Sequence, residues 1–526
     1  MRTIGTALAG LMFGASVAAI AASGCWNVAG DCVAMRSCSE NPDEPPDGDS
    51  SPLPDAPTDV LLPDCEPSPS EDESVLRDEC GIFVKPGVQG GDGTSTDSVG
   101  TLGTALALAS SRDLKRVYVC EGELNEEVRV PPGIEIYGGL ACEDGWKTSE
   151  AKTSLTAPAG QVPLRLSEGD GSGPTRIEGF EVTAAAGATL GQSSVAVIVG
   201  DVDAAIVGCL ITAQAGMLGK VGAWGGEAVP SALPGVAGTA VCTAPPLGGV
   251  LTDSTCDATG GEGGNGSTGS DLPAKDGQPG KPLNKGGVGG IAFTADNGNY
   301  NVACTVPSVG GAGKDGDNGS PGKGGGEGNG DVIPGSLSMD NVYVGRDGVA
   351  GGIGTPGGGG GGGGGRVTQS CSGVPGPGVS GGSGGAGGCN GKGGGGGQAG
   401  GSSIALISLA KEKSLTLTDT TLRASTGGNG GDGGAGQPGG AGGKGGNAAS
   451  ASDCPGGAGG KGGRGGNAGG GAGGHSIGIA YKYKAPSMEN SDIEIDAAGE
   501  AGTGGGTGAG TGAPGHSETT ALLPEN

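Results

Sequence analysis

Short runs of alternating apolar and polar residues recur along the chain from Cys80 onward. They are Val117–Val119, Val128–Val130, Ile134–Ile136, Leu164–Leu166 and Ile177–Val182. Alternation with a period of two predicts β-strands, and Gly, Pro and Asn between the runs predict turns. Short strands at intervals of about 20 residues are typical of the coils of a solenoid. An antiparallel β-domain is the alternative interpretation.

A helical pattern precedes most of these runs. Cys80–Val84 has the composition of a first strand, and Leu102, Ala105, Leu106 and Ala109 then recur at helical spacing. This spacing predicts a short amphipathic helix. The predicted fold class is therefore all-β, a parallel β-helix solenoid that begins with a capping helix.

The stretch from Cys80 to about Gly216 resembles the right-handed parallel β-helices of the pectin-lyase-like superfamily. The resemblance rests on Val117-Tyr118-Val119, Glu127-Val128 and Gly133–Gly139. It implies a right-handed solenoid whose first coil is covered by the helix. We assign residues 80–216 to the N-terminal part of this β-helix.

Three later segments repeat one another. They begin at Ser193-Ser194-Val195, Ser402-Ser403-Ile404 and His475-Ser476-Ile477, and each leads through a second short strand into small residues and a Gly-rich run. We predict that the β-helix continues through 217–512 and that every Gly-rich insertion leaves from the same corner of a coil. Ser336–Ser338 with Val342–Val344 form a partial copy of the repeat.

The Gly-rich runs have a period of three. Gly occupies every third position from Gly427 to Gly445, and the same holds for residues 310–330. Three residues per turn is the repeat of the polyproline-II helix. We expect flexible loops that are partly disordered; the alternatives are polyglycine helices hydrogen-bonded side by side and a collagen-like trimer, for which Pro is scarce. The composition from Gly216 to Gly512 resembles the PGRS-type Gly-rich surface proteins of bacteria, which implies surface location and no assigned chemistry.

Composition excludes some partners. The 526 residues include 128 Gly and only 2% aromatic residues, and the formal net charge is −27. So few large apolar side chains predict a narrow, repeated core. The negative charge opposes binding to nucleic acid and electrostatic adhesion to anionic lipid.

The N-terminus has the pattern of an export signal. Arg2 precedes an apolar run from Ile4 to Ile20, which ends in small residues before Cys25. This resembles a bacterial lipoprotein signal, which implies that residues 1–24 are removed and that Cys25 carries the lipid. An ordinary signal peptide and a membrane-spanning helix are the alternatives. Trp26, which is not Asp, implies the outer membrane or cell surface of a Gram-negative bacterium.

An acidic, Pro-rich stretch follows the signal. Residues 40–79 contain 14 acidic residues and one basic residue. Such a stretch cannot bury enough apolar area to offset its ordering entropy, so we expect residues 25–79 to be a disordered stalk. Residues 513–526 are expected to form a tail.

In an exported chain, cysteines are expected to form disulfides. The sequence has 14, and the plausible local pairs are Cys32–Cys38, Cys65–Cys80, Cys120–Cys142, Cys242–Cys256 and Cys371–Cys389. Cys209, Cys304 and Cys454 remain over. No spacing indicates a metal site made of cysteines.

Candidate catalytic groups are sparse. The acids on polar strand positions are Glu121, Glu126, Glu127, Glu135, Glu178 and Glu181, and the two histidines are His475 and His516. We interpret these acids as solvated strand faces. Asp315, Asp317 and Asn318 give only a weak indication of calcium, because the twelfth loop position is Gly326 where an EF-hand has Glu.

These patterns predict a non-enzymatic structural or adhesive surface lipoprotein without a cofactor. A β-helix rod would carry Gly-rich loops that contact extracellular matrix, polysaccharide or another copy of the chain. The alternative is a polysaccharide-active lyase or hydrolase on the same fold, which would need carboxylates and aromatic residues converging along one face.

Overall fold

The computed structural model describes residues 65–171, 173–252, 256–268, 273–293, 311–323, 345–367, 369–448 and 454–523, all within one unit, 63–526. The predicted signal peptide 1–24, the lipidation site Cys25, the pair Cys32–Cys38, Cys304 and the partial repeat copy at 336–344 lie outside these residues.

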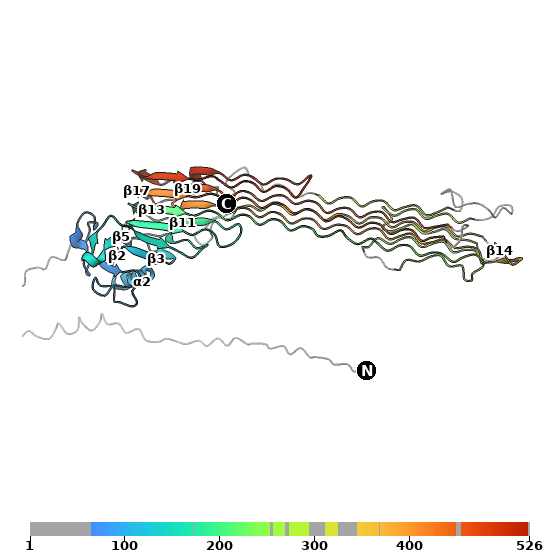
Figure 1. Ribbon diagram of the computed structural model, residues 1–526, viewed down its shortest axis with the longest axis horizontal. Helices are drawn as coiled ribbons and strands as arrows, with labels where there is room; N and C mark the ends of the chain where they lie inside the picture. The colour runs from blue at the N-terminus through green and yellow to red at the C-terminus, as the bar shows by residue number, and fades with distance from the viewer. Residues whose placement is uncertain are drawn as a thin grey trace, which may run out of the picture. The chain divides into compact units, whose positions relative to one another are not determined.

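Three parallel sheets form the strand-rich part of the protein (Figure 1). Sheet A contains β1 (Gly81–Val84), β2 (Arg116–Cys120), β5 (Glu135–Ala141), β9 (Thr175–Glu178), β12 (Ala204–Val207), β17 (Leu415–Thr418) and β20 (Ser487–Glu489), and β6 (Lys147–Thr148) pairs antiparallel to β5. Sheet B contains β3 (Gly122–Asn125), β7 (Thr153–Thr156), β10 (Phe180–Ala184), β13 (Leu210–Ala213), β18 (Thr421–Ala424) and β21 (Asp492–Ile495). Sheet C contains β4 (Val128–Val130), β8 (Leu164–Leu166), β11 (Ser194–Val199), β16 (Ser403–Ser408), β19 (Ser476–Tyr481) and β22 (Ser517–Leu522).

The chain visits the sheets in a fixed cycle of A, B and C, so each cycle is one coil of a parallel β-solenoid. In sheet A, Ile177 pairs with Ile136 in the preceding coil and with Ile206 in the next, which in turn pairs with Leu417. All four side chains are buried in one apolar core. Stacking of like residues therefore gives the narrow, repeated core that the composition predicts, and the all-β fold class is confirmed.

Helix α2 (Leu102–Arg112) caps the first coil. Its buried face consists of Leu102, Ala105, Leu106 and Ala109, and the helix contacts β1, β2 and β4. Thr101 is the N-cap residue, because its hydroxyl accepts a hydrogen bond from the Thr104 amide. The predicted capping helix is therefore present, with its apolar stripe turned toward the core.

Order begins earlier than predicted. A 3-10 turn, η1 (Glu73–Val75), buries Val75 completely, and the Tyr118 hydroxyl donates to the Val75 carbonyl at 2.9 Å. The disulfide Cys65–Cys80 closes this segment. The acidic composition suggested a disordered stalk as far as residue 79, but residues 65–79 fold against the first coil because a disulfide and buried backbone contacts fix them.

The three repeated segments lie in register, as predicted. Val195 pairs with Ile404, and Ile404 pairs with Ile477, in the adjacent strands β11, β16 and β19. The Gly-rich insertions lie between β13 and β16, between β18 and β19 and between β21 and β22. Each insertion therefore leaves at the end of a sheet B strand and returns at the start of the next sheet C strand, which is one corner of the solenoid.

The Gly-rich tracts are not loose loops. Figure 1 shows them running side by side, and backbone hydrogen bonds join them with a period of three. Gly219, Gly222 and Gly225 donate their amides to the carbonyls of Asn429, Asp432 and Ala435 at 2.7–2.9 Å. The tracts thus correspond to the alternative of laterally packed polyglycine helices. We call this assembly the glycine layer.

A run of nine glycines, 357–365, shows how the glycine layer is held together. Gly357, Gly360 and Gly363 donate to residues 388, 385 and 382; Gly358, Gly361 and Gly364 donate to 317, 314 and 311; Gly359, Gly362 and Gly365 donate to 281, 278 and 275. Successive amides therefore bond to three different tracts in rotation. A tract with neighbours on every side has no room for a Cβ atom, which explains why this run consists of glycine alone.

Two of the local disulfide pairings are correct and two are wrong. Cys65–Cys80 and Cys120–Cys142 form as predicted, the latter beside the 3-10 turn η2 (Cys142–Asp144). Cys242 instead pairs with Cys371, next to the hairpin of β14 (Gln369–Cys371) and β15 (Val374–Gly376), and Cys256 pairs with Cys389. Packing of antiparallel tracts brings these distant residues together. Cys454 is also disulfide-bonded, whereas Cys209 is a buried free cysteine whose thiol pKa burial raises to about 11.

Candidate functional site

The acids that sequence reasoning singled out are mostly engaged in structural contacts. Glu126 lies at the N-terminus of α2, where its two carboxylate oxygens accept hydrogen bonds from the Leu102 and Gly103 amides at 2.8 and 3.1 Å. These amides have no partner within a helix, and a carboxylate also interacts favourably with the helix dipole. Glu126 therefore caps the helix that covers the first coil.

Three further acids form ion pairs along the solenoid. Glu127 pairs with Arg165 at 3.0 Å, and the Arg165 side chain is almost entirely buried. Glu178 pairs with Arg176 at 2.8 Å and accepts a hydrogen bond from the Ser70 hydroxyl. Glu135 pairs with Arg116 in the same manner. A buried arginine would be costly without such a partner, so these acids stabilise the coils.

The remaining two acids, Glu121 and Glu181, are exposed and lie apart. Glu121 follows β2 and is 3.4 Å from the Ser149 hydroxyl, whereas Glu181 lies on β10 in sheet B. The six acids are therefore distributed over different sheets and corners. They do not form the line of convergent carboxylates that a polysaccharide-cleaving site on this fold would require.

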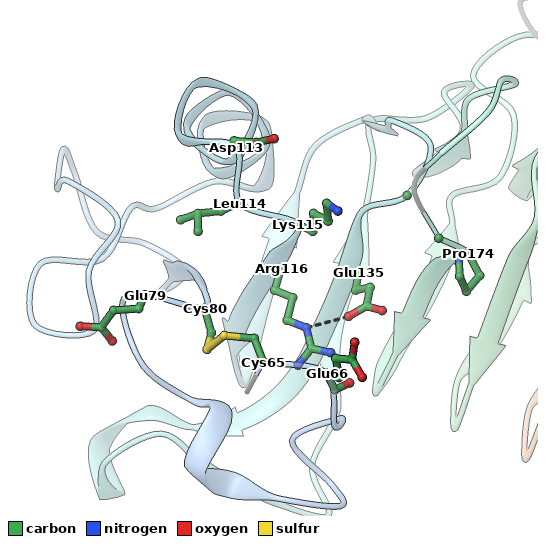
Figure 2. Close-up of a pocket in the computed structure, with 12 residues that line it drawn as sticks. Cys65, Glu66, Glu79, Cys80, Asp113, Leu114, Lys115, Arg116, Glu135 and Pro174 are labelled. Atoms are coloured by element: carbon green, nitrogen blue, oxygen red, sulfur yellow. Dashed lines mark hydrogen bonds and ion pairs between the residues drawn. A yellow bond between two sulfur atoms is a disulfide. The ribbon is translucent and has the colours of Figure 1, made fainter. Parts of the chain in front are cut away.

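A hollow of about 460 Å³ lies beside the capped end (Figure 2). It is lined by Cys65, Glu66, Glu79, Cys80, Asp113, Leu114, Lys115, Arg116, Gly133, Glu135, Gly173 and Pro174. Figure 2 shows the ion pair between Arg116 and Glu135 and the disulfide at its wall. None of these lining residues is Ser, Thr or His, and both lining sulfurs are bonded to each other.

The charged groups of this hollow serve the backbone around it. Arg116 donates to the Pro67 and Glu66 carbonyls at 2.6 Å each and pairs with Glu135 at 2.8 Å. The Tyr137 hydroxyl donates to the other side of the same pair, at the Glu135 carboxylate. Burial, together with the Glu135 charge, raises the pKa of Tyr137, so this phenol stays protonated. The arrangement fastens residues 65–67 to sheet A and offers no nucleophile with an adjacent base.

The two histidines belong to a ladder at the corner where the insertions return. The Ser193 hydroxyl accepts from the Ser402 amide, the Ser402 hydroxyl accepts from the His475 amide, and His475 Nδ1 accepts from the His516 amide, at 2.8–2.9 Å. The two imidazole rings are stacked with centroids 5.5 Å apart. Burial and the neighbouring His516 lower the pKa of His475 to about 4, which keeps Nδ1 available as an acceptor.

Acidic and amide side chains in the glycine layer have a similar role. Asp315 and Asn318 accept hydrogen bonds from the Ala458 and Lys461 amides at 2.8 and 2.9 Å, and Asp432 accepts from the Thr503 amide. Hydrogen bonds from Thr503 lower the pKa of Asp432. Asp and Asn side chains thus accept hydrogen bonds from backbone amides that do not bond to a carbonyl of the glycine layer. Within the described ranges, no three His, Cys, Asp or Glu residues are placed to hold a metal ion.

The surface feature that sequence reasoning missed is a stripe of exposed apolar side chains on the glycine layer. Leu218, Val221 and Trp224 follow one another at a spacing of three residues along the tract from 214, and each is more than half exposed. Val288 and Ile353 protrude from other tracts and are about two-thirds exposed. A period of three puts the side chains of one tract on one side, about 9 Å apart. The sequence contains this signal, because a large apolar residue occupies the third position of successive Gly-x-x triplets in the first tract.

Comparison with protein-family models, curated proteins and solved structures gives no match for this chain. The part of the chain that the structure describes has no helix with the length and apolar character of a membrane span.

Proposed function

We propose that this chain is a non-enzymatic surface protein whose β-solenoid holds the glycine layer out as a contact surface. The observation that carries the proposal is the exposed apolar stripe of Leu218, Val221 and Trp224, because large apolar side chains standing in water on an ordered surface mark interaction sites. The engagement of most candidate acids in caps and ion pairs favours this function over cleavage of a polysaccharide.

The same proposal includes the lipid anchor, the location, the family relationships and the partner of the protein. The lipoprotein-like N-terminus supports a lipid on Cys25 and a place on the outer membrane or cell surface. The solenoid supports a relationship to pectin-lyase-like β-helices, and the insertions support one to PGRS-type proteins. The partner is extracellular matrix, polysaccharide or another copy of the chain.

Adhesion of bacteria that display the full-length chain tests the contact surface. Replacing Leu218, Val221 and Trp224 together by Ser should reduce clumping or attachment to isolated matrix several-fold. Leu522→Ser, at an apolar residue of the sheet C strand β22 that is more than half exposed, is the matched control and should leave adhesion unchanged. Equal adhesion of all three proteins would contradict the proposal.

Two biochemical assays test the rest. Incubation of the pure protein with acidic and neutral polysaccharides should leave their chain lengths unchanged, and depolymerisation would instead establish the enzymatic alternative. Metabolic labelling with a palmitate analogue should mark the wild-type protein and not Cys25→Ser. Labelling of the Cys25→Ser protein would remove the proposed anchor without affecting the proposed contact surface.

A further inference from the structure

The tract 497–505 of the glycine layer lies in a groove between the tracts 427–445 and 456–474. Amides of the first wall donate to its carbonyls, in the pairs Gly427–Ala497, Gly430–Glu500 and Gly433–Thr503. Its own amides donate to carbonyls of the second wall, in the pairs Gly499–Gly474, Gly502–Gly471 and Gly505–Ala468. The N···O distances of these bonds are 2.8–3.0 Å. A row of donors and a row of acceptors, both with a spacing of three residues, therefore hold this tract.

Both walls continue beyond the tract 497–505, and Asn467 marks the point at which this tract ends. Its Nδ2 atom donates to the Thr507 carbonyl at 3.0 Å, and its Oδ1 atom accepts from the Gly436 amide at 3.1 Å. The next members of the donor row are Gly439, Gly442 and Gly445, and those of the acceptor row are Gly462, Gly459 and Gly456. A Cβ atom at each of these donors would overlap the carbonyl oxygen of the opposite acceptor, so the two rows still face each other.

In this continuation neither row is paired. Within the described ranges, the amides of the three donors have no acceptor, and the carbonyls of the three acceptors have no donor. The intervening amides of Gly440 and Gly443 do bond, to the carbonyls of Cys389 and Ala386 at 2.8 Å, so the wall itself is fixed. Gly439 and Gly462 are nonetheless buried. Buried backbone groups without a partner are unfavourable, and the groove therefore favours a further strand that supplies the missing donors and acceptors.

The groove is hollowed at the start of this stretch. A hollow of about 230 Å³ lies over Gly439 and Gly462, and its lining includes the exposed cations Lys461 and Arg464. None of the described residues that line it is Asp or Glu. The charge beside the two rows therefore favours a strand with acidic side chains.

The tract 497–505 shows which residues such a strand needs. A Cβ atom at its glycines would overlap carbonyl oxygens of the first wall, in the pairs Gly499–Gly428, Gly502–Gly431 and Gly505–Gly434. Glu500 and Thr503, between these glycines, are exposed. Every third residue must therefore be glycine, whereas the positions between can carry side chains. At 3.1 Å per residue of a polyproline-II helix, the stretch 436–445 is roughly 28 Å long and accommodates about nine residues.

We propose that this stretch of the groove binds an acidic strand of another polypeptide that has glycine at every third position and the polyproline-II conformation. The bound strand extends the glycine layer in the way that an added peptide extends the edge of a β-sheet, because main-chain hydrogen bonds hold it and the spaces between side chains select it. The groove lies on other tracts than the stripe of Leu218, Val221 and Trp224. Failure of this proposal would therefore leave the proposed contact surface unaffected.

A peptide with the sequence of residues 497–505 is the probe, because this sequence already fits the adjoining stretch of the groove. Millimolar peptide added to the full-length protein should slow amide hydrogen exchange of Gly439, Gly442 and Gly445 several-fold, as measured by NMR. The control peptide carries alanine at the positions of Gly499, Gly502 and Gly505 and should have no effect. Equal protection by both peptides, or protection by neither, would overturn the proposal.

Charge reversal and dilution test the nature of the partner. Lys461→Glu should weaken binding of the probe peptide several-fold, whereas Lys220→Glu, at an exposed lysine of the tract that carries the apolar stripe, is the matched control and should leave it unchanged. Equal binding by the two variants would overturn the preference for an acidic strand. Without peptide, protection of the three amides that increases with protein concentration would identify a second copy as the partner. Protection that is independent of concentration would overturn the proposal, because a segment of the same chain would then fill the groove.

Discussion

At the residue scale, the clearest device is the ladder of side chains at the corner where the insertions return. Ser193 and Ser402 each accept the amide of the equivalent residue in the next coil, and His475 does the same with Nδ1. His475 stands at the position of the repeat where the sister copies have Ser193 and Ser402, and the three residues therefore have the same structural role. A histidine can replace serine in this role only while its ring is neutral.

This requirement makes stability depend on pH. Above pH 6.5 the His475 ring is neutral in the folded and the unfolded chain. Between pH 6.5 and about 4 the His475 ring is protonated in the unfolded chain but neutral in the folded chain. The free energy of unfolding therefore falls as the pH falls, and the loss is complete below about pH 4. The total corresponds to about 3 kcal/mol.

His475→Ser should remove this dependence, because a hydroxyl accepts the His516 amide at any pH. Hydrogen exchange of β22, measured at pH values from 7 to 4 and corrected for intrinsic rates, should accelerate in the wild type and remain flat in the variant. A parallel acceleration in both proteins would show that another group is responsible.

At the element scale, the glycine layer is held by its backbone. Because each amide of the run 357–365 bonds to one of three tracts in rotation, any side chain there separates two tracts. A methyl group at Gly360 would overlap the Gly457 carbonyl. The number of glycines in a triplet therefore increases with the number of tracts that pack around it. A large residue such as Trp224 occurs only on a side that no other tract covers.

Gly360→Ala should therefore destabilise the layer by several kcal/mol, the range typical of overpacking and lost buried hydrogen bonds. Thermal unfolding followed by hydrogen exchange of residues 380–388 measures the effect. Gly173→Ala, where a Cβ meets nothing within 4 Å, is the control and should be nearly silent. If both variants melt alike, the close packing of the layer is refuted.

The strand pairing could be predicted from sequence, whereas the packing of the tracts could not. Val195, Ile404 and Ile477 stand in segments with the same alternation and the same exit, so a shared corner and register follow from local pattern. The amide partners of Gly360 or Gly361, in contrast, lie in tracts far away along the chain. Because glycine has no side chain, its residue type does not indicate which tract it packs against. The only pattern that the sequence provides in these tracts is the spacing of three residues.

The features of the candidate site also differ in how far they can be predicted from the sequence. The exposed stripe at Leu218, Val221 and Trp224 has a period that can be read directly, once the tract is known to be ordered. The capping role of Glu126 and the hydrogen bonds of Asp315 and Asn318 depend on contacts with distant backbone amides, which residue type alone does not reveal.

At the scale of the whole molecule, disulfides secure the solenoid and the glycine layer separately. Cys65–Cys80 and Cys120–Cys142 close short loops around the capped end, whereas Cys242–Cys371 and Cys256–Cys389 close loops of 129 and 133 residues within the layer. In the chain-entropy model a loop of this length contributes on the order of 4–5 kcal/mol. The local pairings Cys242–Cys256 and Cys371–Cys389 failed because they ignored how tracts fold back.

Replacing Cys242 and Cys371 together by Ser should accelerate hydrogen exchange in the layer around residues 378–385 and leave β11 and β12 unaffected. Replacing Cys65 and Cys80 together is the matched control and should accelerate exchange around η1 alone. Spread of the first effect into the solenoid strands would show that the two parts unfold as one.

The shared corner has a consequence for how such a chain can change. Since each excursion begins after a sheet B strand and ends before a sheet C strand, its length does not enter the geometry of the coils. Duplicating or deleting an outgoing tract together with its returning partner would alter the reach and breadth of the layer while every strand kept its register. The size of the glycine layer can therefore change through tandem duplication of tracts, whereas the β-solenoid changes independently through point substitution.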